Sequence, residues 1–336
     1  MAQTHDTHPL VAAQIEAFRR RQPVRAGSLI VTVYGDAIAP RGGTVSLASL
    51  TRLLHAFGLS PGLVRTAVSR LAADGWLGRS AVGRRGFYSL TEVGRRRSER
   101  AARRIYGGPP GAWAGTWQIA IIPGGPGGRR EALRRDLAWL GFGQLAPGVM
   151  ARPVADGGAT GAAAPDGLGE DGDGEVVVID GRSRPVAPGT LARLAAGCWD
   201  LDALAAGYAA FVERFDPLRR ALAGGERLPP LDCLLVRLLL IHEYRRIVLR
   251  DPMLPAEMLP DGWVGGDAHG LCRAVYGAVA DGAEGWVSAN LETAAGPLPP
   301  PDAAFAARFG GPDGLGGGAT RSPSPAAGAE GGRGSA

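Results

Sequence analysis

Between Leu59 and Ser80 the sequence combines an apolar stripe with a strip of arginine and hydroxyl side chains. The apolar residues recur at the spacing of an amphipathic helix and are Leu63, Val64, Ala67, Val68, Leu71 and Ala72. The opposite face carries Arg65, Thr66, Ser69 and Arg70. Such side chains hydrogen-bond phosphates and base edges in DNA complexes. This strip is therefore either solvated surface or a face that lies against a polyanion.

The elements around this stretch predict how the strip is positioned. Ser60 followed by Pro61 indicates a helix start, and Gly75 indicates its end. The preceding "VSLASLTRLLHAFG" predicts another helix with Ser46 as its cap, and only "GLS" separates the two. Helix, tight turn and helix form a helix-turn-helix, whose second helix reads bases in the major groove.

The residues after Gly75 predict a hairpin. "GWLGRSAV" and "GFYSLT" have strand character, and "GRR" joins them with glycines on either side that permit a tight turn. The residues expected to pack inward are Trp76, Leu77, Phe87, Tyr88 and Leu90. Arg79, Arg84 and Arg85 are expected to project at the tip, which suits the phosphate backbone or the minor groove. The segment thus predicts a winged helix-turn-helix, followed by a basic helix capped by Thr91.

The charge distribution supports a polyanion partner. The chain of 336 residues carries a net charge of +5, but the segment from Ser60 to Tyr106 holds eleven arginines against three acidic residues. That local excess of +8 is typical of a nucleic-acid-binding segment. The chain contains no lysine, so the choice of arginine carries no information and only its clustering does.

Another concentration of polar groups lies in "LLIHEYRRIVLRDP". His242, Arg245, Arg246 and Arg250 share helical spacing there, and Glu243 can hold one of the arginines. One interpretation is a set of buried ion pairs that tie the C-terminal helices to the central domain. The other is a recess for the phosphates of a CoA ligand, with an apolar part lined by Trp199, Tyr208 and Trp263 unless those are plain core.

The sequence offers no catalytic or metal-binding constellation. The three cysteines, Cys198, Cys233 and Cys272, lie far apart, which excludes a zinc motif and indicates a cytoplasmic protein without disulfides. The glycine-rich turn in "IIPGGPGGRREAL" lacks the lysine and the glycine register of nucleotide-binding loops, so we interpret it as a loop. We expect no cofactor and no metal. No apolar run approaches the roughly 20 residues of a membrane-spanning helix, and the N-terminus has no signal-peptide pattern.

The pattern along the chain predicts an α+β protein of several domains. The ranges are a flexible leader with one possible short helix (1–27), a DNA-binding domain (28–110), a central α/β sandwich (111–199), a helical C-terminal domain (200–290) and a disordered tail (310–336). Within the central domain, 154–174 is expected to be a flexible loop and "EVVVID" a buried strand.

The stretch from "SLIVTVYGDAIAP" through "GFYSLTEVGR" resembles the N-terminal domain of the PaaX-type transcriptional repressors. The likeness continues in "LAWLGFGQLAPGVMARP", "CWDLDALAAGYAAFVERFDPL" and "LLIHEYRRIVLRDPMLPAEMLPDGWVG", and spans roughly residues 28–290. It implies a winged helix, a ferredoxin-like central domain similar to small CRISPR-associated nucleases, and a helical C-terminal domain. It also implies a homodimeric repressor that an aryl-CoA thioester such as phenylacetyl-CoA releases from DNA. "SLIVTVYGDAIAP" is strand-like by propensity, yet the resemblance makes it the first helix.

Three functions remain open at this level. The favoured one is a repressor of an aromatic catabolic operon that binds double-stranded operator DNA. The second is a hydrolase or nuclease built on the central domain, although "IAIIP" offers no acidic residue at the end of its first strand. The third is a nucleoid-type DNA binder without a ligand.

Overall fold

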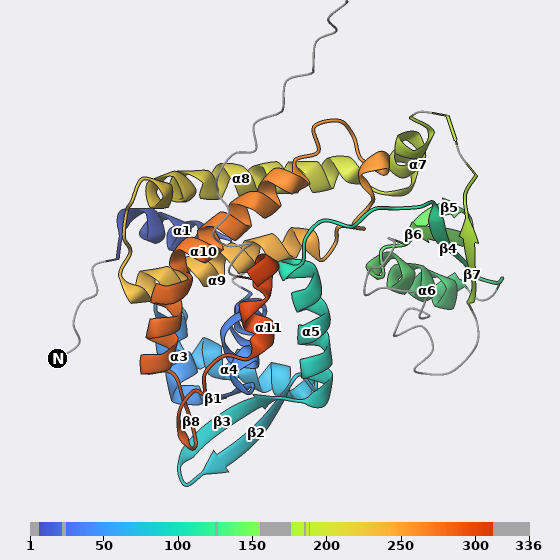
Figure 1. Ribbon diagram of the computed structural model, residues 1–336. Coiled ribbons are helices and arrows are strands. Elements are labelled where there is room, and N and C mark those ends of the chain that lie inside the picture. The colour runs from blue at the N-terminus through green and yellow to red at the C-terminus, as the bar shows by residue number, and fades with distance from the viewer. Residues whose placement is uncertain are drawn as a thin grey trace, which may run out of the picture.

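The computed structural model describes residues 7–21, 25–124, 127–154, 176–184, 186–187 and 189–311. Figure 1 shows a large helical body with a small sheet at its base and a separate α/β unit beside it. The chain passes from the body into this unit after α5 (Glu92–Tyr106) and returns through α7 (Thr190–Cys198) into α8 (Leu201–Ala223). The predicted flexible loop (154–174) and disordered tail (310–336) lie outside the described residues except at their first positions, where Val154 N donates to Thr116 O and Gly310 belongs to a short helix.

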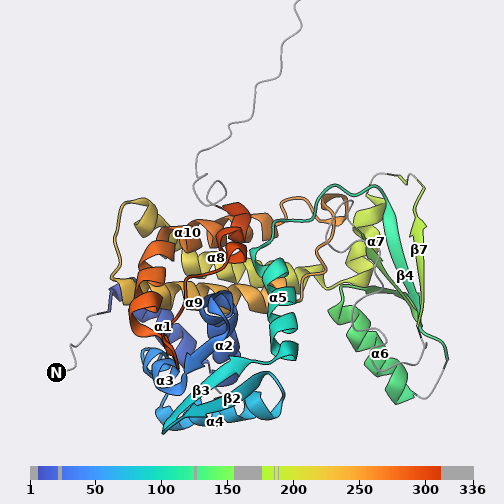
Figure 2. The ribbon, with the colours of Figure 1, turned by 60° about the horizontal axis from the view of Figure 1, so that its bottom comes forward.

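The N-terminal part of the body contains four helices and a small sheet before α5. Their bounds are α1 (Pro9–Arg20), α2 (Ala26–Val33), η1 (Tyr34–Ile38), η2 (Ala39–Arg41), β1 (Thr44–Ser46), α3 (Leu47–His55), α4 (Pro61–Ala73), β2 (Leu77–Val82) and β3 (Arg85–Leu90). The sheet is antiparallel, with strand order β1-β3-β2. Figure 2 shows α4 and the β2–β3 hairpin together at the end of the molecule away from α8 and α10.

The helix α2 confirms the expectation from the family resemblance that this segment is helical. "SLIVTVYGDAIAP" forms α2, which continues into the π-helical turn η1 and then η2. Leu29, Ile30 and Val33 are fully buried, and Asp36 in η1 is also buried. Packing on all sides overrides the strand propensity of the β-branched residues.

The leader differs from the expectation. Its described part is not free chain but forms α1, which His8 caps and whose buried residues are Val11, Ile15 and Phe18. Phe18 meets Phe57 edge-on, with ring centroids 6.3 Å apart. The leader thus contains the short helix that the sequence allowed, but this helix is not flexible, because its apolar stripe packs into the core of the body.

The separate unit is an antiparallel sheet with strand order β5-β6-β4-β7. Its elements are β4 (Thr116–Ile121), α6 (Gly127–Trp139), β5 (Gly143–Ala146), β6 (Val149–Pro153), β7 (Val177–Arg182) and the helix α7. "EVVVID" does form a strand, but it is not buried: β7 lies at the sheet edge, and Val177 and Ile179 are exposed. Val177 and Ile179 alternate with Val178 along the strand, so they share the face of β7 that stays in contact with solvent.

The C-terminal part is helical, as predicted. It consists of α8, α9 (Pro230–Val248), η3 (Ala256–Met258), α10 (Gly265–Asn290), a hairpin of β8 (Glu292–Thr293) and β9 (Gly296–Pro297), α11 (Ala303–Ala306) and η4 (Arg308–Gly310). The residues after α10 fold back toward the N-terminal part, so that β8 packs against β1. No helix among the described residues is long and apolar enough to cross a membrane.

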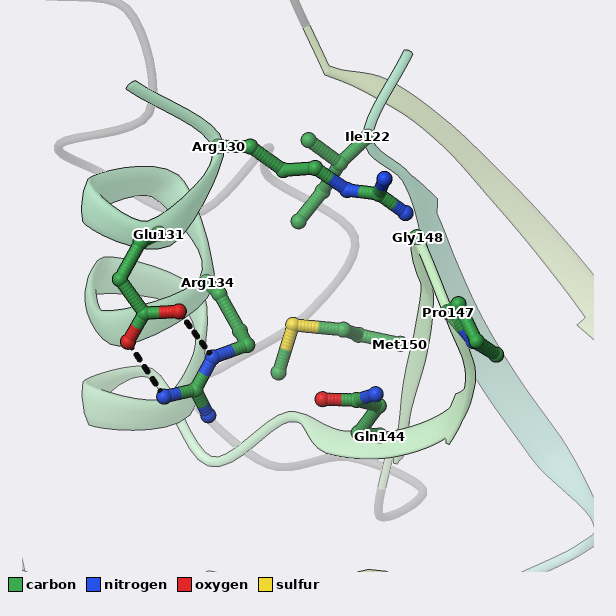
Figure 3. A pocket seen from close by; sticks show the side chains of 8 residues that line it. All are labelled: Ile122, Arg130, Glu131, Arg134, Gln144, Pro147, Gly148 and Met150. Atoms are coloured by element: carbon green, nitrogen blue, oxygen red, sulfur yellow. Dashed lines mark hydrogen bonds and ion pairs between the residues drawn. The ribbon is translucent and has the colours of Figure 1, made fainter. Parts of the chain in front are cut away.

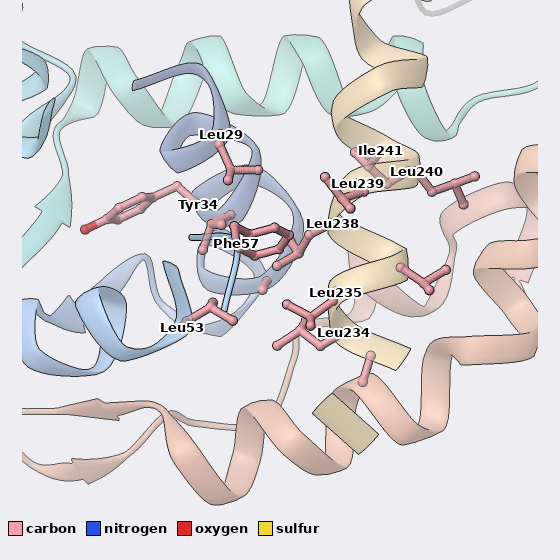
Figure 4. Close-up of a cluster of buried hydrophobic side chains, with 14 of the residues drawn as sticks. Leu29, Tyr34, Leu53, Phe57, Leu234, Leu235, Leu238, Leu239, Leu240 and Ile241 are labelled. Carbon is pink, nitrogen blue, oxygen red and sulfur yellow. The ribbon is translucent and has the colours of Figure 1, made fainter. Parts of the chain in front are cut away.

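One hydrophobic core joins the N-terminal and C-terminal parts of the body. It runs from Val11 to Phe309 and includes side chains from α1, α2, α3, α4, α8, α9 and α10. Figure 4 shows Phe57 and Leu29 of the N-terminal part facing the leucine-rich helix α9. The α/β unit has two smaller clusters of its own, one of which is shared with α8 and η3. The N-terminal segment and the C-terminal helices thus form one packed unit.

Candidate nucleic-acid interface

The helices α3 and α4 begin at the predicted capping residues. Ser46 Oγ accepts a hydrogen bond from Ser49 N at 3.0 Å, and Ser60 Oγ accepts one from Leu63 N at 3.3 Å. Between the helices, Gly58 adopts a positive φ of +79°, and Leu59 N returns to Leu54 O at 3.2 Å. Only glycine adopts this backbone conformation without strain. The sequence therefore sets both the start of α4 and the tight turn before it.

The two faces of α4 separate as predicted. Val64, Ala67 and Val68 are buried, whereas Arg65, Thr66, Ser69 and Arg70 are all exposed. One residue of the predicted apolar stripe behaves differently, since Leu63 is 40% exposed. It lies in the first turn of the helix, beyond the reach of the body's core. The exposed arginine and hydroxyl strip runs from Arg65 to Arg70, over the second and third turns of α4.

The hairpin β2–β3 closes with a two-residue turn, because Val82 pairs with Arg85 across it. Gly83 has a positive φ of +59°, which a tight turn of this kind requires. The residues predicted to face inward are buried or half-buried and are Trp76, Leu77, Phe87, Tyr88 and Leu90. Arg84 and Arg85 are exposed at the tip, as predicted, whereas Arg79 is exposed but lies along β2 opposite Tyr88, so its predicted place at the tip was wrong.

These exposed arginines differ in how they are paired. Within the residues that the structure describes, no carboxylate lies within ion-pair distance of Arg65, Arg70, Arg79 or Arg84. Arg85 is different: it forms an ion pair with Glu292 in β8, and its guanidinium carbon lies 5.4 Å from the Phe87 ring centroid. Four of the predicted arginines thus present uncompensated positive charge at one end of the molecule.

The second predicted site lies on α9, and its members turn toward different partners. His242 Nδ1 and Thr32 Oγ1 are 3.0 Å apart, and Arg245 donates to Ser28 O and Thr32 Oγ1, each at 3.0 Å. Burial lowers the pKa of His242 to about 4, so the ring is neutral at pH 7. His242 and Arg245 therefore bind α9 to α2, and not to the central unit.

The other two predicted residues, Arg246 on α9 and Arg250 just after its end, lie nearer the surface. Arg246 lies 3.4 Å from Glu243, whose carboxylate also contacts Arg214 at 3.1 Å and Arg21. Arg250 is exposed. The structure thus does not bring the four predicted ligand residues around one recess, and their role in binding a ligand stays a prediction.

A buried ion network, which the sequence did not predict, connects the N-terminal and C-terminal parts of the body. Asp36 Oδ2 lies 2.8 Å from Arg237 Nε, and Arg237 contacts Glu284 at 2.6 Å. Arg308 and the Tyr106 hydroxyl also contact the Asp36 carboxylate, and Arg41 pairs with Glu284. Burial alone would lower the pKa of Arg237, but Asp36, Tyr276 and Glu284 raise it above its ordinary value. A single arginine amid the leucines of α9 is the sequence signal that points to such a network.

The α/β unit contains an open cavity of about 200 Å³ between α6 and the turn from β5 to β6. Figure 3 shows Ile122 and Met150 beside it, Arg130 across its mouth, and Glu131 paired with Arg134. None of the predicted ligand-binding residues lines this cavity. The described residues contain no group of three or more His, Cys, Asp or Glu side chains placed to hold a metal ion.

The chain is similar to known proteins over most of its length. Three family models match the chain: "PaaX-like protein" over residues 25–94, "PaaX protein central Cas2-like domain" over 110–156, and "PaaX-like protein C-terminal domain" over 199–289. The chain is also 39% identical to the transcriptional repressor PaaX of Escherichia coli (strain K12) over 295 residues, which covers 86% of this chain and 91% of the relative. The chain belongs to the PaaX family.

The family models follow the parts of the structure. The first PaaX model spans α2 to the start of α5, the Cas2-like model spans β4 to β6, and the C-terminal model spans α8 to α10. Among solved structures, an uncharacterized protein from Mycobacterium tuberculosis is 25% identical, with a TM-score of 0.44, over 70% of this chain and 88% of that one.

Proposed function

We propose that this PaaX-family chain is a cytoplasmic DNA-binding repressor of an aromatic, phenylacetate-type catabolic operon. The observation that carries the proposal is the exposed strip Arg65, Thr66, Ser69 and Arg70 on α4, beside the unpaired hairpin arginines Arg79 and Arg84. The repressor activity of the Escherichia coli relative, which is similar over most of both chains, supports the same conclusion.

In this proposal residues 26–90 are a winged helix-turn-helix. The order α2, β1, α3, α4, β2, β3 and the antiparallel sheet β1-β3-β2 support this assignment. α4 enters the major groove, where Arg65 and Arg70 read base edges and Ser60, Thr66 and Ser69 contact bases or phosphates. Arg79, Arg84 and Arg85 bind the phosphate backbone or the minor groove through the wing.

The central unit is assigned as a ferredoxin-like domain. Its strand order β5-β6-β4-β7 and the position of α6 between β4 and β5 support that assignment. β4 ends in Ile121, and the next residues are Ile122 and Pro123, so this edge offers no carboxylate for metal-assisted hydrolysis. The residues of the chain therefore favour a regulatory over a nuclease role for the domain.

The protein acts as a homodimer in this proposal, because recognition helices that read a palindromic operator work in pairs. An aryl-CoA thioester such as phenylacetyl-CoA releases it from DNA. Release requires that the thioester bind the DNA-incompetent arrangement more tightly than the competent one.

Fluorescence anisotropy tests the proposal directly. The full chain is titrated onto its own upstream intergenic DNA and onto random duplex at fixed salt, with and without phenylacetyl-CoA. We expect tight, selective binding that the thioester abolishes and that free phenylacetate or CoA leaves intact. Equal binding to operator and random duplex contradicts the repressor function. DNA cleavage or thioester hydrolysis that His242→Ala abolishes would establish an enzyme instead.

A further inference from the structure

The boundary between the α/β unit and the body differs from the boundaries inside the body. The DNA-binding segment and the C-terminal helices share one continuous core and the buried pair Asp36–Arg237. The α/β unit instead meets the body through a separate small cluster around Trp117, Leu254 and Met258. A shift between the N-terminal segment and the C-terminal helices would break buried ion pairs and a large core. A shift of the α/β unit against the body disturbs few contacts.

Two arginines flank the contact at this second boundary. Arg152 on β6 donates to Leu140 O at 3.0 Å and to Gln118 Oε1 at 2.8 Å. Arg104 near the end of α5 donates to the backbone oxygen of Asp251. The two segments that these arginines hold touch each other, since a Cβ on Gly141 would lie 3.5 Å from Pro252 O.

Within the described residues neither arginine of this pair forms an ion pair, and the nearby carboxylates of Asp251 and Asp180 offset the two positive charges from a longer distance. Every hydrogen bond that Arg104 and Arg152 make within the described residues goes to a neutral oxygen. The Asp251 carboxylate accepts hydrogen bonds from the Tyr208 hydroxyl and from Met253 N, each at 2.7 Å. Asp180, which faces Gln118 across the sheet, offsets the charge of Arg152 in part.

The pKa values of both arginines agree with this geometry. Burial, and then repulsion from Arg104, lower the pKa of Arg152 from its ordinary value. Burial also lowers the pKa of Arg104, against the attraction of Asp251. A phosphate between them would gain charge-assisted hydrogen bonds and relieve this repulsion.

Aromatic side chains gather at the same boundary. Trp199 Nε1 donates to Gly141 O at 3.2 Å, and the Tyr208 and Trp263 rings lie 6.1 Å apart. Trp199 and Trp263 are only partly buried. One interpretation of the sequence makes these three residues the apolar lining of a ligand recess beside His242 and Arg245. The structure places them beside Arg104 and Arg152 instead.

We propose that the junction of Arg104, Arg152 and the aromatic residues Trp199, Tyr208 and Trp263 binds the phosphate groups of the acyl-CoA effector. The choice of ligand rests on the proposed function. Because the junction joins the α/β unit to the body that carries α4, a ligand that binds there changes the position of one relative to the other. This links effector binding to the spacing of the recognition helices in a dimer.

The test compares Arg152→Gln and Arg104→Gln with Arg130→Gln in the full chain. Arg130 is a matched control, because it lies on the same α/β unit and lines the cavity of Figure 3. We expect all three variants to bind operator DNA as the wild type does. Losing one charge-assisted contact should raise the phenylacetyl-CoA concentration for half-release about tenfold or more in Arg152→Gln and Arg104→Gln. Arg130→Gln should release at the wild-type concentration.

Release of Arg152→Gln and Arg104→Gln at the wild-type concentration overturns the site, as does an equal shift in Arg130→Gln. Arg152→Lys keeps the charge and covers the case in which Arg152→Gln does not fold; it should stay closer to the wild type. If phenylacetyl-CoA leaves the wild-type complex intact, the proposed effector fails, and pyrophosphate then tests the site alone through tryptophan fluorescence. If the wild type binds pyrophosphate saturably and Arg104→Gln binds it more weakly, the anion site is retained. If the wild type does not bind pyrophosphate, the anion site is overturned.

Discussion

Arg85 at the end of the β2–β3 turn is ion-paired with Glu292, which lies in the hairpin after α10. The same carboxylate accepts a long hydrogen bond of 3.5 Å from Ser46 Oγ at the start of α3. Arg52 on α3 donates to Asn290 O at 3.4 Å. The C-terminal hairpin therefore contacts both the wing and the first helix of the helix-turn-helix. For Arg85 to bind a phosphate, it must first leave Glu292.

Replacing this carboxylate should strengthen DNA binding. Exposed ion pairs are worth about 0.2–1 kcal/mol, so Glu292→Gln should tighten binding to operator and random duplex alike by about 1.5- to 5-fold. Removing a negative charge beside the wing acts in the same direction. The measurement is anisotropy at low salt, with Glu257→Gln as control, because Glu257 is exposed in η3, which packs against α7 and not against the hairpin. Unchanged or weaker binding by Glu292→Gln would show that the pair does not compete with DNA.

The strip on α4 and the wing should respond differently to mutation. Arg65→Ala removes a base contact in the proposed docking, which costs about 1–3 kcal/mol of discrimination between operator and random duplex. Arg84→Ala removes a phosphate contact, so it should weaken all DNA equally and reduce the salt slope by about 1. Titration at three salt concentrations separates the two effects. Operator binding by Arg65→Ala as tight as that of the wild type would mean that α4 is misplaced.

The buried network at Asp36 predicts a large effect on stability. Asp36→Asn leaves Arg237 buried with only Glu284 as a charged partner, and breaking a buried pair in this way costs about 3–5 kcal/mol. Asp216→Asn is the control, because Asp216 pairs with Arg219 and Arg220 near the surface and should change stability by about 0.5 kcal/mol or less. Urea unfolding followed by circular dichroism measures both. A small effect of Asp36→Asn would indicate that water reaches the site.

The DNA-binding segment could be predicted from sequence because its signals are local. The Ser60–Pro61 cap, the turn at Gly58 and the Gly83 hairpin each act within a few residues, so the boundaries of α4 and of β2–β3 followed from residue types. That residues 28–40 are helical was predicted from the family resemblance alone. The burial of α2 depends on α9, which lies some 200 residues away along the chain.

The remaining features depend on contacts distant in sequence. His242, Arg245 and Arg250 recur at helical spacing, but the sequence does not show that α9 ends at Val248, before Arg250, or that α2 packs on the other two. The ion pair Asp36–Arg237 joins residues 201 positions apart, and nothing near either residue specifies the other. Likewise, Arg104 and Arg152 become neighbours of one boundary only through the packing of the α/β unit on Pro252.

His242 predicts a pH dependence of stability. Its pKa lies at about 4 in the folded protein against about 6.5 in an unfolded chain, so the unfolded state binds an extra proton between these values. Stability should therefore fall as the pH drops from 6.5 toward 4, by up to about 3 kcal/mol from this residue. His242→Gln should lose less stability than the wild type between pH 7 and pH 5, whereas His55→Gln, at an exposed site, should follow the wild type. If the stability of the wild type and of His242→Gln in urea unfolding falls in parallel with pH, the ring takes up its proton in the folded state as well. The group that contacts Thr32 is then an imidazolium.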